Sequence, residues 1–278
     1  MIVRCRRFIV TLSVVLCAWL PPSAAARQAP ATRPAATQPA RPTPDVLAAF
    51  KPNTLVEAGR VVLNYRLLSP APVEPGRQYP LVIVLHGAGE RGGDNTRQLF
   101  HVAHDFLAAR DRHPAFVVFP QCPEGVWWTG DNTLRNIPAE PGVEKPLPRV
   151  IDLINRLRKE LPVDESRIYL TGLSMGGFGT FALVAQLPDT FAAAVPVCGG
   201  GDPAWAKHLA TTPMWIFHGD ADNVVPPEKS REMVEAIRRA GGNVQYREYP
   251  GVGHDSWTPT YSDPAVLDWM FAQRRPQR

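Results

Sequence analysis

Cysteine is scarce in this chain, with four in 278 residues, and positive charge is in excess only near the N-terminus. Residues 1–44 hold six arginines and no acidic residue, and the remaining 24 basic and 26 acidic residues give the rest of the chain a net charge of −2. A basic domain is the electrostatic footprint of a nucleic-acid-binding protein. Because no such domain is present, we expect no nucleic-acid partner.

Long hydrophobic runs are also missing. The run from Phe8 to Leu20 has 13 residues, short of the roughly 20 that a membrane-spanning helix needs. Three arginines precede it and small alanines up to Ala26 follow it, which is the layout of a secretory signal peptide. We predict a signal peptide at 1–26 rather than a membrane anchor. The protein would then be secreted or periplasmic, with no stable membrane insertion after cleavage.

The next stretch, residues 27–44, is rich in proline and alanine and has no periodic apolar pattern, which predicts a disordered linker. Residues 45–278 suit one α/β domain of ordinary size. Two cysteines remain in this domain, Cys122 and Cys198, and an oxidising compartment would allow a disulfide between them. We expect two unpaired, partly buried thiols instead, since buried free cysteine is common.

The apolar pattern changes along this domain. In residues 60–68 one side of the chain is apolar, which predicts an antiparallel strand that pairs with residues 55–57 across a short turn. Short apolar runs without alternation follow, typical of strands buried on both faces, at 81–85, 116–119, 168–171, 193–197 and 214–217, with a further strand at 244–249. Helical spacing appears at 148–161, 175–187, 227–240 and 264–273. This alternation predicts a mostly parallel, doubly wound sheet with an N-terminal antiparallel hairpin.

A tight turn is indicated at residues 172–176, where GLSMG fits the pattern G-x-S-x-G. This pattern presents a nucleophilic serine between a strand and a helix. Five-residue patterns recur by chance, but here an apolar strand precedes the turn and a helical pattern follows it. In a parallel sheet such a turn lies at the carboxyl ends of the strands, where ligands bind. Ser174 is therefore the candidate nucleophile.

A nucleophilic serine needs a base that is held by a third group. The strand at 214–217 leads into HGDADNVVP, which brings Asp220 or Asp222 to the same edge of the sheet. The segment PGVGHDSW then places His254 in a glycine-rich loop. His254 would accept the proton of Ser174, and an aspartate would fix the tautomer of its ring.

With these residues in the order Ser, Asp, His, the chain from about residue 53 onward resembles the α/β-hydrolase superfamily. The resemblance implies that fold for residues 45–278, with Ser174 as nucleophile and His254 as base. It implies Asp222 as the acid, because the segment His-Gly-x-x-Asp-x-x-Val often carries the acid in that superfamily; Asp220 is the alternative. The stretch at 198–213 is too short for a large cap domain.

The same resemblance implies an oxyanion hole formed by two backbone N–H groups. One belongs to Met175, the residue after the serine. The other belongs to Ala88 in the loop LHGAGERGGDN, with Gly89 as the alternative. We expect Glu90 to support this loop, because a carboxylate beside the oxyanion would oppose catalysis.

Shorter stretches resemble a narrower group. HGAGERG, PQCPEG and GHDSW are similar to segments of secreted feruloyl esterases, acetylxylan esterases and polyhydroxybutyrate depolymerases. This implies a serine esterase that cleaves carboxylic esters, on small molecules or on polysaccharides. The alternatives are a serine peptidase of the prolyl oligopeptidase type and a non-catalytic binding protein on the same scaffold.

Three tryptophans are candidate substrate contacts. Trp127 and Trp128 lie in the long stretch 121–148 between a strand and a helix, where they form a substrate platform or cover the core. Trp257 follows His254 and lines the pocket or braces the loop. The sequence does not decide between these roles.

A metal site is the other hypothesis that the sequence raises. His101, His104 and Asp105 stand at helical spacing, but without a fourth ligand they indicate a polar helix face rather than a metal site. The serine mechanism supplies nucleophile, base and oxyanion donors, so we expect no metal and no organic cofactor. The oligomeric state is left open.

Overall fold

The structure is a computed structural model, and it describes residues 41–131 and 145–276. The predicted signal peptide at 1–26, most of the predicted linker at 27–44, and residues 132–144 of the long stretch lie outside the described residues. Helix α1 (Pro44–Ala49) begins at the last residue of the predicted linker. The Thr43 hydroxyl accepts a hydrogen bond from the Val46 N–H and caps this helix.

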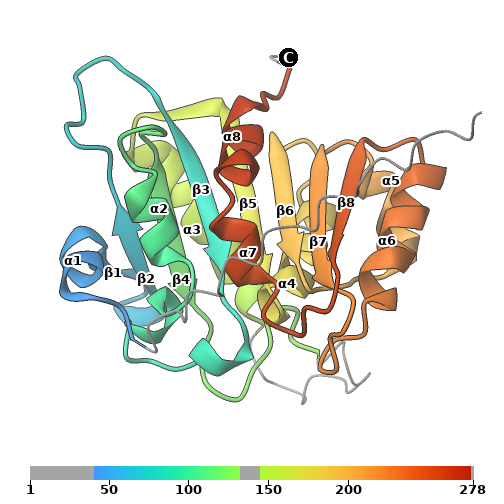
Figure 1. The fold of residues 1–278 in the computed structure, drawn as a ribbon. Helices are drawn as coiled ribbons and strands as arrows, with labels where there is room; N and C mark the ends of the chain where they lie inside the picture. The colour runs from blue at the N-terminus through green and yellow to red at the C-terminus, as the bar shows by residue number, and fades with distance from the viewer. Residues whose placement is uncertain (1–40, 132–144, 277–278) are drawn as a thin grey trace, which may run out of the picture. The chain divides into compact units, whose positions relative to one another are not determined.

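An open eight-stranded sheet in the order β1-β2-β4-β3-β5-β6-β7-β8 runs through the described chain (Figure 1). The hairpin of β1 (Lys51–Glu57) and β2 (Arg60–Leu68) is antiparallel, and β2 also pairs antiparallel with β4. All other neighbours are parallel, with β3 at Tyr79–Leu85, β4 at Phe116–Gln121, β5 at Val163–Leu173, β6 at Ala193–Val197, β7 at Met214–Gly219 and β8 at Val244–Tyr249. The predicted fold, a mostly parallel sheet with an N-terminal hairpin, is confirmed.

Strand β3 illustrates why the central strands are continuously apolar. All seven of its residues are buried. Leu81, Ile83 and Leu85 belong to one hydrophobic core, and Val82 and Val84 belong to the other. Both faces of the strand must therefore be apolar, as in any parallel strand that is covered by helices on both sides.

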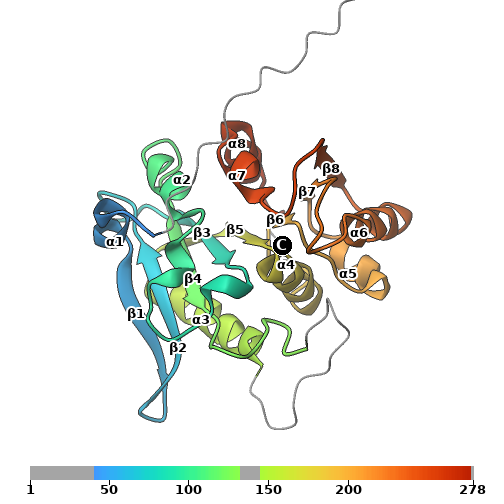
Figure 2. The same cartoon turned by 60° about the horizontal axis from the view of Figure 1, so that its bottom comes forward.

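The helices form a layer on each face of the sheet (Figure 2). One layer holds α3 (Pro146–Glu160), α4 (Met175–Gln186), α5 (Ala206–Leu209) and α6 (Glu228–Arg239). The other holds α1, α2 (Ala103–Ala108), α7 (Trp257–Tyr261) and α8 (Pro264–Ala272). The loops of the described ranges also hold short 3₁₀-helices, η1 at Ala88–Glu90, η2 at Arg97–Leu99 and η3 at Pro203–Trp205.

The connection between β6 and β7 is short and holds η3 and α5, in agreement with the expected lack of a large cap there. No helix of the described ranges is long and apolar enough to cross a membrane. Cys122 and Cys198 are free, as expected, and are fully rather than partly buried.

Candidate active site

Ser174 occupies the sharp turn between β5 and α4, with φ 53° and ψ −117°. Such a backbone conformation costs a non-glycine residue about 1–3 kcal/mol and is typical of functional sites. A Cβ on Gly172 would lie 2.4 Å from the carbonyl oxygen of Gly176, and a Cβ on Gly176 would lie 2.0 Å from that of Leu85. Only glycine at both positions lets the strand and the helix approach this closely, so the two glycines encode the turn.

His254 comes to Ser174 from the loop after β8. Its Nε2 lies 2.9 Å from Ser174 Oγ, and its Nδ1 lies 2.7 Å from Asp222 Oδ2. An ionised carboxylate only accepts hydrogen bonds, so Nδ1 carries the proton and Nε2 of the neutral ring accepts from the Ser174 hydroxyl. This is the tautomer that a general base needs.

Asp222 lies in the loop after β7, with a fully buried side chain. Its Oδ1 accepts the backbone N–H groups of Val224 at 2.8 Å and Val225 at 2.9 Å. Its Oδ2 lies 2.7 Å from His254 Nδ1 and 3.2 Å from His218 Nε2. Burial alone would raise the pKa of this carboxyl, but the hydrogen bonds from His218, His254 and the backbone outweigh it and hold the pKa well below its usual range.

The neighbouring aspartates have other partners. The exposed Asp220 accepts the backbone N–H of Gly251 at 2.7 Å. Asp255 accepts from the backbone N–H and hydroxyl of Thr258 at the start of α7. Of the two acids that the sequence left open, Asp222 is the one that the structure brings to His254.

The two expected oxyanion donors each begin a helix. Ala88 begins η1 and Met175 begins α4, and the first N–H groups of a helix have no partner within it. The loop of Ala88 lies against the turn, since a Cβ on Gly87 would come within 3.6 Å of Ser174 Cβ. The arrangement can thus direct two N–H groups at a substrate oxygen.

Trp128 lies in the core and is fully buried. Its indole Nε1–H donates to the carbonyl oxygen of His86 at 2.9 Å, just before the loop of Ala88. The core alternative therefore describes Trp128, and a substrate does not reach its ring in the described structure. Trp128 instead holds the strand end from which the oxyanion loop begins.

His86 fixes the same loop from within. Its Nε2 accepts the backbone N–H of Cys122 at 2.9 Å, and its Nδ1 donates to the carbonyl oxygen of Gly87 at 2.6 Å. Acceptance at Nε2 needs the neutral ring, in the tautomer whose proton is on Nδ1. Burial lowers the pKa of His86 to about 4, which keeps the ring neutral around pH 7.

Trp127 and Trp257 are both partly exposed. The guanidinium of Arg91 lies 5.8 Å from the Trp127 ring, and its Nε donates to the carbonyl oxygen of Ala88 at 2.8 Å. Trp257 contacts the ring of His254 edge to face, with centroids 5.3 Å apart. Trp257 therefore packs against the base, and both Trp127 and Trp257 stay candidates for a substrate contact.

The histidines at helical spacing have separate carboxylate partners. His101 Nε2 lies 3.0 Å from Oε1 of the buried Glu90, so this bond ties η1, which begins with Ala88, to His101. His104 Nε2 lies 3.4 Å from Asp105 Oδ1. Burial raises the pKa of Asp105 to about 6. The two rings do not converge on one point.

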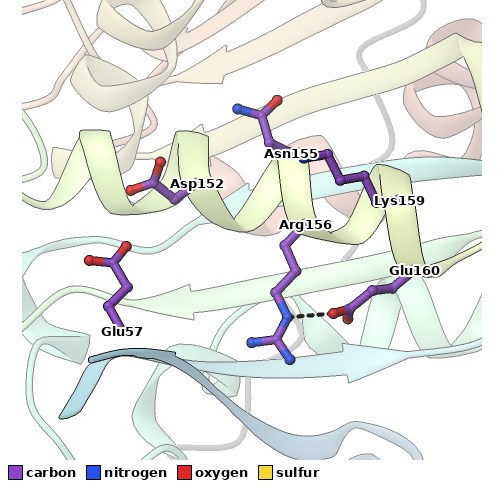
Figure 3. Close-up of a pocket in the computed structure, with 6 residues that line it drawn as sticks. All are labelled: Glu57, Asp152, Asn155, Arg156, Lys159 and Glu160. Carbon is purple, nitrogen blue, oxygen red and sulfur yellow. Dashed lines mark hydrogen bonds and ion pairs between the residues drawn. The ribbon is translucent and has the colours of Figure 1, made fainter. Parts of the chain in front are cut away.

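Within the described ranges, the metal-ligating side chains that come within 4.8 Å of one another are Cys198, Asp222 and His254. Two of these are the candidate acid and base. A separate hollow of about 420 Å³ beside α3 has open, ion-paired walls, with Arg156 bonded to Glu160 at 2.8 Å (Figure 3). It is lined by Glu57, Asp152, Asn155, Arg156, Lys159 and Glu160 and contains none of the candidate site residues.

Sequence reasoning did not assign roles to His86 and His218. A signal was present for both, because each is the histidine of a His-Gly pair that directly follows an apolar strand run. The pattern placed them at the correct edge of the sheet, but it did not show what their rings bond: the ring of His86 accepts the N–H of Cys122, and the ring of His218 contacts Ser230 of α6.

Comparison with known families finds that residues 72–263 match the phospholipase/carboxylesterase family. A crystal structure of a thermostable esterase is 41% identical to the chain, with a TM-score of 0.75 over 83% of this chain and 64% of that one. A poly(3-hydroxyalkanoate) depolymerase of Paucimonas lemoignei is 26% identical over 72% of this chain and 51% of its own length. A bifunctional acetylxylan esterase/xylanase of Neocallimastix patriciarum is 28% identical over 73% of this chain.

The chain thus spans about half of the depolymerase and 28% of the bifunctional enzyme. The family match at residues 72–263 contains the strands and loops that carry the candidate site. The likeness therefore concerns this domain.

Proposed function

Because the chain belongs to the phospholipase/carboxylesterase family and has the α/β-hydrolase fold, we propose that it is a carboxylic ester hydrolase that cleaves esters through an acyl-enzyme on Ser174. His254 is the general base and Asp222 is the acid that orients it. The observation that carries this proposal is the pair of hydrogen bonds that joins the three side chains, 2.9 Å from Ser174 Oγ to His254 and 2.7 Å from His254 to Asp222.

In the first half of the reaction, Ser174 Oγ attacks the ester carbonyl while its proton passes to His254 Nε2. The carbonyl oxygen becomes an oxyanion between the N–H groups of Met175 and Ala88. When the intermediate collapses, the C–O bond to the alcohol breaks and His254 returns the proton to the leaving oxygen. Asp222 holds the imidazolium during this step.

In the second half, a water molecule attacks the acyl-enzyme and gives its proton to His254. The same two N–H groups hold the second oxyanion. The carboxylic acid leaves, and Ser174 recovers its proton from His254. The leaving group of an ester is easier to protonate than that of an amide, and ester cleavage therefore stands ahead of the peptidase alternative. A binding protein without catalysis is disfavoured because nucleophile, base and acid are all present.

We further propose that the protein is exported and acts on bulky esters, among them acyl groups on polysaccharide. The support is the leader-like sequence at 1–26, the similarity to a polyester depolymerase and an acetylxylan esterase, and the short connection between β6 and β7. Trp127 is the aromatic side chain that we expect to contact such a substrate.

The direct test is Ser174→Ala. We expect loss of turnover on p-nitrophenyl acetate and of labelling by a fluorophosphonate, with an unchanged melting temperature. A panel of short p-nitrophenyl esters, methyl ferulate, acetylated xylan and peptide anilides then ranks the substrates. Full activity in Ser174→Ala, or labelling at another residue, would refute the nucleophile; preference for the anilides would favour the peptidase.

A further inference from the structure

His218 is a fully buried histidine that the ester-cleaving steps do not use. It is the second-last residue of β7. Its ring contacts the acid, the loop after the acid, and helix α6. Its Nε2 lies 3.2 Å from Asp222 Oδ2 and 2.9 Å from the carbonyl oxygen of Val225. Its Nδ1 lies 2.7 Å from the hydroxyl of Ser230.

The hydrogen-bond partners of this ring determine where its proton is. Both neighbours of Nε2 are acceptors only, so Nε2 must carry a hydrogen. The Ser230 hydroxyl has one hydrogen and two acceptors within reach, His218 Nδ1 and the carbonyl oxygen of Gly199 at 2.9 Å. In a neutral ring the hydroxyl donates to Nδ1; in a charged ring Nδ1 donates to the hydroxyl, which turns to Gly199. The Nε2–H is present in both states.

We propose that His218 is a positioning residue for the catalytic acid: its Nε2–H holds Oδ2 of Asp222, and Ser230 holds the ring in the tautomer that keeps this N–H. The inference rests on the proposed function, since it assigns His218 to the same acid. In an ionised carboxylate with four donors, neither oxygen is free to rotate away from His254. The backbone of Val224 and Val225 holds one oxygen, and His254 and His218 share the other.

The same network connects the acid with the helix of the nucleophile. Ser230 lies in α6 and reaches the loop after β6 at Gly199. A Cβ on Gly199 would lie 2.6 Å from the carbonyl carbon of Gly177, in the first turn of α4. Side chains larger than glycine cannot fit between them. The network thereby links the position of Asp222 to α4, the helix that directly follows Ser174.

A second carboxylate also lies near the ring. Glu248 of β8 interacts electrostatically with His218. It is held by Arg231 of α6 at 2.5 and 3.0 Å, and that bond is the first cause of its lowered pKa. Arg231 offsets the charge of Glu248. The carboxylate within hydrogen-bond distance of Nε2 is that of Asp222.

The experiment compares two variants of His218, each with an amide side chain that keeps one of the two hydrogen-bonding positions of the ring. In His218→Gln, the amide nitrogen can occupy the place of Nε2 and still donate to Asp222. In His218→Asn, the shorter side chain reaches Ser230 and loses the bond to the acid. A hydrogen bond to a charged group corresponds to about 10- to 100-fold in rate. We expect His218→Asn to lose kcat by this factor with KM within about 2-fold, and His218→Gln to stay within about 3-fold of wild type.

The pH profile separates positioning from a structural role. When Asp222 Oδ2 loses the His218 donor, it binds its remaining donor, the His254 N–H, more tightly and stabilises the protonated base. The acid limb of kcat/KM should therefore move to higher pH in His218→Asn and stay in place in His218→Gln. A role limited to packing would lower the melting temperature of both variants and leave the limb where it is.

Two controls complete the test. His113→Asn removes another histidine bonded to an aspartate, Asp268 at 2.7 Å, away from the site, and should leave kcat unchanged. In the Asp222→Asn background, His218→Asn should cost little more. Equal kcat loss from His218→Gln and His218→Asn, or additive losses with Asp222→Asn, would overturn the role of His218. If Asp222→Asn itself retains wild-type kcat, the proposed acid fails instead, and the two failures are distinguishable.

Discussion

Asp220 and Asp222 are two positions apart in the sequence but have different surroundings. Asp222 is buried and accepts bonds from two rings and two backbone N–H groups. Asp220 is exposed and accepts one backbone N–H, that of Gly251. The same substitution at the two positions therefore tests the assignment of the acid.

We predict that Asp222→Asn lowers kcat on p-nitrophenyl acetate by a factor of order 10⁴, because the His254 ring is then free to adopt the wrong tautomer; the matching change in a serine protease has this size. Asp220→Asn should stay within a few-fold of wild type. Steady-state kinetics with a melting temperature for each variant measures both. The assignment is off by two residues if Asp220→Asn is the more damaging change.

The positions of Ser174, Asp222 and His254 could be reached from the sequence because each lies in a short local motif next to an apolar strand. The roles of His86, His218 and Trp128 could not. Trp128 and His86 depend on a partner in another segment: Trp128 bonds a carbonyl oxygen 42 positions away, and the ring of His86 accepts an N–H 36 positions away. The bond of His218 to Asp222 is local, but the tautomer of its ring depends on Ser230 of α6. A tryptophan pair in a long loop gives no indication of which ring turns inward.

The oxyanion loop, residues 86–92, is the element in which these contacts meet. Trp128 bonds its first carbonyl oxygen and Arg91 bonds that of Ala88. Neighbouring tryptophans thus have separate tasks: Trp128 supports the loop from the core, and Trp127 stays partly exposed beside Arg91. Kinetics on two substrates can separate these tasks.

We predict that Trp128→Phe, which keeps an aromatic ring and removes the donor, lowers kcat on all esters about 3- to 10-fold with little change in KM. It leaves a buried carbonyl oxygen of His86 without its donor, which costs about 1–3 kcal/mol of stability. Trp127→Ala should instead raise KM several-fold for methyl ferulate or acetylated xylan and leave p-nitrophenyl acetate unaffected, since a ring contact contributes about 0.5–1.5 kcal/mol beyond area burial. Equal losses on small and bulky esters with a lower melting temperature would make Trp127 structural as well.

Secondary structure followed the sequence where a pattern was long enough to repeat. The helices predicted at 175–187, 227–240 and 264–273 appear as α4, α6 and α8 within a residue or two. By contrast, β5 begins at Val163, five residues before the apolar run, because its first half is a polar, partly exposed extension. One-turn elements such as η1 and α5 carry too few residues for a period. η1 follows β3, and α5 lies in the connection between β6 and β7.

Two of the described groups, His86 and Asp105, contribute with opposite signs to the stability of the molecule in acid. His86 has a folded pKa of about 4 against an ordinary value of 6.5, because burial disfavours its charge. The unfolded chain therefore binds this proton first, and the stability that His86 contributes above pH 6.5 is lost as the pH falls toward 4. Burial raises the pKa of Asp105 to about 6. The folded state therefore binds this proton first, and Asp105 adds stability to the fold over nearly the same pH range.

The contribution of His86 can be isolated by His86→Gln, whose amide oxygen can still accept the Cys122 N–H but does not titrate. In urea unfolding between pH 7 and pH 4, we predict that wild type loses stability relative to this variant as the pH falls, by up to about 1.4 kcal/mol for each unit of pKa difference. The variant itself starts less stable at pH 7, because the bond from Nδ1 to Gly87 is gone. The free-energy difference should therefore narrow steadily below pH 6.5, whereas the contribution of Asp105 is common to both proteins and cancels. If the difference is constant across this range, His86 does not titrate with a lowered pKa, and the oxyanion loop does not depend on a neutral ring at this position.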